Sequence, residues 1–169
     1  MLVARSVAEA HLYLDLRGAD RAGRTARLEA RGDDLVSVYE ADCGGVRKRF
    51  EFSIPVPEAR DGTYGDAEPS SILGPGELVG WSDHVARTVP ADAAGLPPAD
   101  RAESRRRLRI AADCVEEAVK FIPADADSVP SEAFRSEYDR AVLAAEPGRF
   151  TRARLAAIAA TYRRMADGY

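Results

Sequence analysis

The first third of the chain alternates apolar and polar residues as β-strands do. Three segments alternate outright, and a fourth is rich in β-branched and aromatic side chains, which favour strands. These segments are residues 11–16 (HLYLDL), 25–30 (TARLEA), 46–54 (VRKRFEFSI) and 35–41 (LVSVYEA). Glycine and aspartate at 31–34 and 42–45 are typical of tight turns. The pattern predicts a small antiparallel meander of three or four strands.

Helical spacing begins after this β-rich segment. Residues 58–76 are rich in Gly, Pro, Ser and Asp, which predicts a long connecting loop. Four apolar stripes at helical spacing follow. The stripes are Leu78, Trp81, Val85 and Val89; Leu108, Ala111, Val115, Ala118 and Ile122; Phe134, Tyr138, Ala141 and Val142; and Leu155, Ile158, Tyr162 and Met165. The helix starts expected from capping residues and proline are Asp100 with Glu103, Pro130 and Thr151.

Strands followed by helices indicate an α+β fold. We expect a small N-terminal antiparallel β meander packed against about four C-terminal helices. The length of 169 residues fits a single domain. Within it we expect a β lobe at 1–57, a loop at 58–76 and a helical lobe at 77–169. The residues expected to meet in the core are Leu12, Leu14, Phe50 and Phe52 from the β lobe and Leu108, Val115, Leu155 and Ile158 from the helices.

Composition narrows the class of protein. Hydrophobic residues make up 46% of the chain and charged residues 31%, as in ordinary soluble proteins. The net charge of −4 disfavours nucleic acid as a partner, and the basic run at 105–109 lacks interleaved aromatic residues. No apolar run reaches the roughly 20 residues of a membrane span, and the first residues do not resemble a signal peptide. A cytoplasmic protein without a membrane partner is therefore expected.

The use of amino acids points to a source. The chain has no Asn or Gln, and lysine occurs only at Lys48 and Lys120 among 24 basic residues. This bias indicates a GC-rich bacterial genome. It also means that arginine is the default cation here, so richness in arginine by itself is not evidence of a binding site.

Two similar pentapeptides stand at expected chain reversals. ADRAG covers residues 19–23 and ADCGG covers residues 41–45. A zinc ribbon carries C-x-x-C followed by glycine at such places. In this chain the four ligand positions hold alanine or glycine, and Cys43 lies between two of them. Two glycine turns that look alike by chance are the alternative explanation.

At these residues the chain resembles a group of uncharacterised actinobacterial small proteins. Members have an N-terminal segment like HLYLDL, two C-x-x-C-G knuckles, a strand like KRFEF, a loop like AEPSS and an end like EPGRFTRARL. The resemblance implies a zinc-ribbon-like unit with a helical C-terminal part. All four ligand cysteines are replaced here, at Ala19, Ala22, Ala41 and Gly44. The replacement removes the metal role, so neither a bound metal nor a cofactor is expected.

One group of side chains has the chemistry of a catalytic site. On a strand at 11–16, His11, Tyr13 and Asp15 share one face. An imidazole, a phenol and a carboxylate together are suited to acid–base catalysis. The alternative is that this face is simply the solvated side of an antiparallel sheet.

Two functions follow from these observations. The first is a non-catalytic cytoplasmic interaction or accessory protein, of an immunity type or in a pathway, because no catalytic motif forces a reaction class. The second is a small-molecule-transforming enzyme of specialised metabolism, with a pocket between sheet and helices and His11, Tyr13 and Asp15 as its catalytic residues. The partner is accordingly another protein or a small molecule, and whether the protein is an enzyme stays open at this level.

Overall fold

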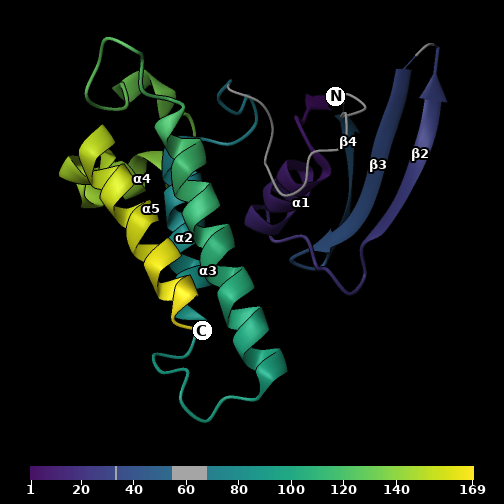
Figure 1. Cartoon of the computed structure of the whole chain (residues 1–169). Coiled ribbons are helices and arrows are strands. Elements are labelled where there is room, and N and C mark those ends of the chain that lie inside the picture. The colour runs from purple at the N-terminus through teal and green to yellow at the C-terminus, as the bar shows by residue number, and fades with distance from the viewer. Residues whose placement is uncertain (33, 55–67) are drawn as a thin grey trace. The chain divides into compact units, whose positions relative to one another are not determined.

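The computed structural model describes residues 1–32, 34–54 and 68–169 (Figure 1). The chain divides into two compact units, Met1–Leu73 and Gly74–Tyr169, and each is described by itself. In its described residues the first unit contains the β-sheet and one helix, and the second unit is helical. The α+β class is therefore confirmed. Most of the loop expected at 58–76 lies outside the described residues.

A four-stranded sheet organises the first unit. Its strands are β1 (Leu2–Val3), β2 (Thr25–Arg31), β3 (Asp34–Cys43) and β4 (Val46–Ser53), in the order β1-β4-β3-β2. The expected meander is confirmed for β2, β3 and β4, which pair antiparallel in sequence order. The turn between β3 and β4 uses Gly44 and Gly45 at φ of 64° and 83°, in the left-handed region that glycine tolerates best.

Residues 11–16 are helical, so the strand predicted there is wrong. They belong to α1 (Val7–Leu16), and the fourth strand of the sheet is instead β1, which pairs parallel with β4. Ser6 caps the helix by accepting a hydrogen bond from the amide of Glu9 at 3.1 Å. The alternation of leucines was misleading because α1 is buried on more than one side. Its buried residues are Glu9, Ala10, Leu12 and Leu14.

Helix α1 lies on one face of the sheet, and the core of the first unit forms between them. Phe52 is fully buried there, in one cluster with Leu14 and Tyr39. The rings of Tyr13 and Tyr39 each lie edge-on to Phe52, with ring centres 5.7 Å away. Phe50, on the same face of β4, is only partly buried. The alternation in the sequence of β4 thus gives the correct inward face.

The second unit consists of four α-helices with short 3₁₀ turns. They are α2 (Pro75–Arg87), α3 (Pro98–Val119), α4 (Glu137–Ala145) and α5 (Arg152–Asp167), with 3₁₀ turns at Ser131–Ala133 and Pro147–Phe150. The four expected helices are present, and Thr151 caps α5 as predicted, accepting from the amide of Arg154. The stripe of α3 is buried as expected at Leu108, Ala111, Val115 and Ala118.

Three details of the helical part differ from the sequence prediction. Helix α3 begins at Pro98, so Asp100 lies inside its first turn rather than at the cap. Helix α4 begins after Ser136, because Pro130 leads only into a 3₁₀ turn. Tyr138 and Met165, which belong to the expected apolar stripes, are 51% and 43% exposed. Among the described residues, no helix has the length and apolar character needed to cross a membrane.

Candidate functional site

The structure separates Tyr13 from the other two predicted catalytic residues. His11 and Asp15 are one helical turn apart on α1 and therefore lie on one side of it. Tyr13 projects elsewhere: its ring packs against Phe52, and the Arg17 guanidinium lies 4.5 Å from its ring centre. The predicted shared strand face does not exist because the segment is a helix.

His11 and Asp15 line a pocket in the first unit. The pocket has a volume of about 420 Å³. Its lining residues are His11, Asp15, Arg21, Arg24, Ala26 and Tyr39. Sequence reasoning missed the two arginines and Tyr39, since these residues reach the pocket from the loop after α1 and from β3. Tyr39 supplies the phenol that was assigned to Tyr13.

Two arginines hold the carboxylate of Asp15. Arg24 donates to it at 2.7 Å, and Arg21 donates at 3.1 Å through its Nε. Burial acts to raise the pKa of Asp15, but the hydrogen bonds from Arg21 and Arg24 outweigh it, and the pKa lies below its ordinary value. Asp15 is therefore ionised at neutral pH and committed to ion pairs, which does not suit a general base.

His11 is the group in this pocket best suited to exchange a proton. Its ring lies edge-on to Tyr39, with ring centres 5.4 Å apart. Partial burial lowers the pKa of His11 below 6.5, and the charge of Arg24 lowers it further, although Asp15 acts in the opposite direction. The imidazole is thus neutral at pH 7 and able to accept a proton or a hydrogen bond.

Arg24 gives the pocket its charge. Its side chain is 10% exposed and donates to the carbonyl of Ala19 at 2.9 Å as well as to Asp15. Its Nε is buried, and no hydrogen-bond partner for it is found in the described part of the chain. With two arginines against one aspartate, the pocket is electropositive. It therefore favours a small anionic ligand.

The two pentapeptides lie next to each other in the fold. Ala19 forms an antiparallel β-bridge with Cys43, and the amide of Asp20 donates to the carbonyl of Asp42 at 2.8 Å. Within the described residues, no three His, Cys, Asp or Glu side chains gather as a metal site would require. At this position backbone hydrogen bonds join the two segments.

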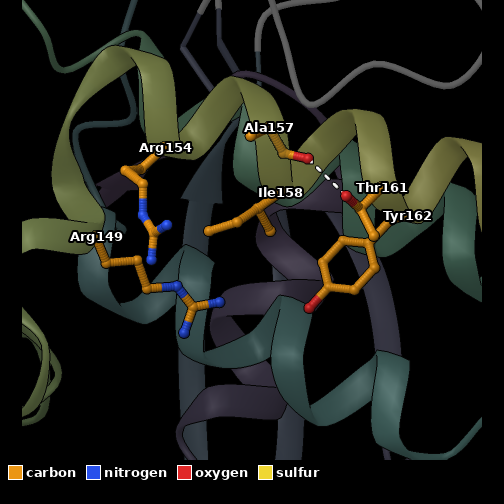
Figure 2. Close-up of a pocket in the computed structure, with 6 residues that line it drawn as sticks. All are labelled: Arg149, Arg154, Ala157, Ile158, Thr161 and Tyr162. Atoms are coloured by element: carbon orange, nitrogen blue, oxygen red, sulfur yellow. Dashed lines mark hydrogen bonds between the residues drawn. The ribbon is translucent and has the colours of Figure 1, made fainter.

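A second pocket lies along α5 in the helical unit. Figure 2 shows its lining residues, and its volume is about 370 Å³. Arg149 beside it donates to both carboxylate oxygens of Asp83, at 2.7 and 2.6 Å. Tyr162 donates to the same carboxylate at 3.0 Å. These contacts tie α5 and the 3₁₀ turn before it to α2. They pair Arg149 and Tyr162 with Asp83 within the unit, whereas the buried Nε of Arg149 has no hydrogen-bond partner in the described part of the chain.

Strand β2 is the most exposed regular element of the sheet. It forms the edge opposite β1, as Figure 1 shows. Six of its seven residues are exposed, and Glu29 is half-buried. Ala26, Leu28 and Ala30 lie on the face that carries Tyr39, and Leu28 is 69% exposed. The outer edge of β2 has no paired strand among the described residues.

The other face of the sheet carries a network of ion pairs. Three arginines and three glutamates from β2, β3 and β4 form it. The pairs are Arg27–Glu29, Arg27–Glu40, Arg31–Glu29, Arg31–Glu51, Arg49–Glu29 and Arg49–Glu51, at 2.7–3.1 Å. Hydrogen bonds from Arg31, and then from Arg49, lower the pKa of Glu51 to about 2.

Two apolar residues of β3 lie on the face that carries the network. Ion pairs between β2 and β4 must cross β3, which contributes Val36 and Val38 to this face. Both valines are buried, with exposed fractions of 1% and 0%. In the strand register, Val38 stands between Arg27 on β2 and Glu51 on β4, and Val36 stands opposite Glu29. The face is therefore a fixed pattern of alternating charges that extends to the β2 edge.

Comparisons with protein-family models, with curated proteins and with solved structures find no match to this chain. The geometry of the two units is therefore the basis for the proposals that follow.

Proposed function

We propose that this chain is a non-catalytic interaction protein, an accessory or immunity-type factor of the cytoplasm of a GC-rich bacterium, and that it contacts another protein through strand β2. The observation that carries the proposal is the exposure of β2 on both faces at the edge of the sheet. An edge strand offers backbone N–H and C=O groups to an added strand. Strand addition of this kind is a common mode of protein recognition.

The composition of β2 supports this role. Edge strands are usually protected by short length, by proline, by bulges or by charged side chains, and of these β2 has only its charged side chains. Strand β2 has seven residues in continuous register with β3 and contains no proline or glycine. At its centre stands Leu28, which is exposed and flanked by charges of opposite sign at Arg27 and Glu29. Leu28 would thus give a partner an apolar contact, and the charges on either side of it would make that contact specific.

A photo-crosslinking residue at position 28 tests the proposal. In the native host, we expect it to give a discrete protein adduct, because Leu28 lies at the proposed contact. The same residue at Val46, a strand residue 58% exposed beside the β3–β4 turn, serves as the control. Arg27→Glu in the same chain should abolish the adduct at position 28. Equal adducts at both positions, or none at position 28, would contradict the proposal.

The second candidate function is binding or turnover of a small anionic molecule in the His11 pocket. The electropositive lining and the neutral imidazole favour it. Its chemistry differs from the predicted one, because Asp15 is paired and Tyr39 replaces Tyr13. This candidate function therefore depends chiefly on His11, and Arg24 assists it.

The titration of His11 tests the geometry of this pocket. NMR should show His11 titrating below 6.5, with the pKa rising in Arg24→Met because a nearby positive charge is removed. The change Arg17→Met, on the same helix, is the control, since Arg17 lies over Tyr13 and does not line the pocket. A His11 pKa that does not respond to Arg24→Met would mean that the pocket is arranged differently.

A further inference from the structure

We infer that the protein bound at β2 is a second copy of this chain, with the two β2 strands pairing antiparallel about a two-fold axis at Leu28. The inference rests on the proposed contact at β2 and names its partner. Two sheets would then join into one continuous sheet across the axis. A two-fold interface requires that one surface be complementary to itself. The sequence of β2 meets this condition.

The register follows from charge and face. In an antiparallel pair, side chains directly opposite each other lie on the same face of the sheet. With Leu28 on the axis, Arg27 of one chain lies opposite Glu29 of the other, and the same pair recurs by symmetry. Ala26 lies opposite Ala30, and Leu28 lies opposite itself. Every residue of Thr25–Arg31 then has a partner within the strand.

Neighbouring registers place like charges together. An axis at Arg27 sets Arg27 opposite itself. An axis at Glu29 sets Glu29 opposite itself and Arg27 opposite Arg31. Like charges directly opposite each other destabilise a sheet. Of the registers available, the one centred on Leu28 matches the charges and also pairs the full length of the strand.

This pairing adds stabilising contacts on both faces of the sheet. On one face, Ala26, Leu28 and Ala30 meet the same residues of the second copy, which removes the exposed leucine from water. On the other, the pair of Arg27 and Glu29 extends the ion-pair network across the axis. Glu29 is ionised at neutral pH, because hydrogen bonds from Arg31 and then Arg27 lower its pKa. The alternating charges of β2 would repel many other strands, but they are complementary to those of a second copy of β2.

Sedimentation equilibrium of the full chain tests the inference, with Leu28→Lys and with charge reversals at the strand. We expect the native chain to form a dimer at micromolar concentration. Leu28→Lys should raise the dimer dissociation constant by roughly tenfold or more, because two ammonium groups meet on the axis. Val46→Lys, which changes an exposed residue on β4 away from β2, should leave the dissociation constant unchanged.

The decisive measurement mixes two variants. Arg27→Glu alone and Glu29→Arg alone each put like charges opposite one another, so each should be monomeric. Mixed together, the two variants place opposite charges at both pairs, so a heterodimer should form. Mixing cannot repair a folding defect within one chain, so the heterodimer would report on the interface itself. Absence of the heterodimer, when both variants are folded by circular dichroism, would overturn the inference.

Other outcomes separate this inference from the proposed function. If the native chain stays monomeric even at concentrations 100-fold above the micromolar range, the inference that the partner is a second copy is wrong. If position 28 then cross-links to a different protein, the contact at β2 stands with another partner. If the native chain dimerises and Leu28→Lys leaves the dimer intact, the dimer uses another surface and the inference fails. Self-adducts at position 28, together with the heterodimer, support both proposals.

Discussion

Replacing Phe52 by alanine should destabilise the first unit by about 3–5 kcal/mol, the range measured for buried phenylalanines. Phe52 is fully buried between α1 and the sheet, and the edges of two tyrosine rings meet it. Truncation removes this apolar contact and leaves a cavity that Tyr13 and Tyr39 cannot fill without leaving their ring contacts. The loss is a large share of the stability of a unit of this size.

Phe50→Ala provides the matched control for this prediction. It makes the same change on the same strand and the same face, but at a partly buried position. Its cost should be clearly smaller than that of Phe52→Ala. Hydrogen exchange of the β3 and β4 amides measures both, since these strands lie in the first unit. Equal protection losses in the two variants would mean that the core lies elsewhere.

Strands β2 to β4 could be predicted because side chains alternate between the two faces of a strand, so a period of two residues shows which face is buried. In 46–54, apolar residues occupy every second position around Phe50 and Phe52, and the fold buries that side. The helical stripes were informative for the same reason, as Leu108 and Val115 show. Where a helix or strand buries a single regular face, the order of apolar and polar residues is enough to predict which side is buried.

Helix α1 could not be assigned from its apolar pattern. Leu12 and Leu14 are both buried, although two positions along a helix point in nearly opposite directions. A helix buried around much of its circumference loses the 3.6-residue period and can imitate a strand. The local signal that identifies it is the capping pair of Ser6 and Glu9, S-x-x-E ahead of an apolar run.

The candidate site was predicted only in part, for a related reason. His11 and Asp15 were found by their chemistry, and they do share a pocket. Arg24 and Tyr39 join them through the tertiary fold, which no local spacing encodes. The self-complementarity of β2 was visible in the sequence, but it has meaning only once the structure places this strand at the edge of the sheet.

The second large effect is expected at Asp139, a buried carboxylate on α4. One of its oxygens accepts hydrogen bonds from the amides of Gly76 and Glu77 at 2.5 and 3.0 Å, and the other accepts from Arg135 at 2.8 Å. Asp139 thereby caps α2 from a distant part of the chain. Gly76 is required because a Cβ there would lie 2.5 Å from the carbonyl oxygen of Asp139.

Asp139→Ala should cost the second unit about 3–5 kcal/mol, since the buried amides of Gly76 and Glu77 and the part-buried amide of Arg135 lose a charged acceptor at once. Trp81, the only tryptophan, lies on α2, so its fluorescence during urea unfolding reports the loss. Asp167→Ala, at an exposed position near the end of α5, is the control and should stay within roughly 0.5 kcal/mol. A small effect of Asp139→Ala would show that solvent or other side chains cap α2.

The pKa of Asp139 predicts the direction in which the stability of the second unit changes with pH. Burial raises the pKa of Asp139 above 3.8, although the amides of Arg135, Glu77 and Gly76 act in the opposite direction. The folded state thus binds the proton more tightly, so the associated stability is full below the unfolded pKa and is lost as pH rises through the folded one. Asp139→Asn does not titrate, so its stability deficit relative to the native chain should shrink as pH rises above about 4. A deficit that widens over this range would contradict the raised pKa.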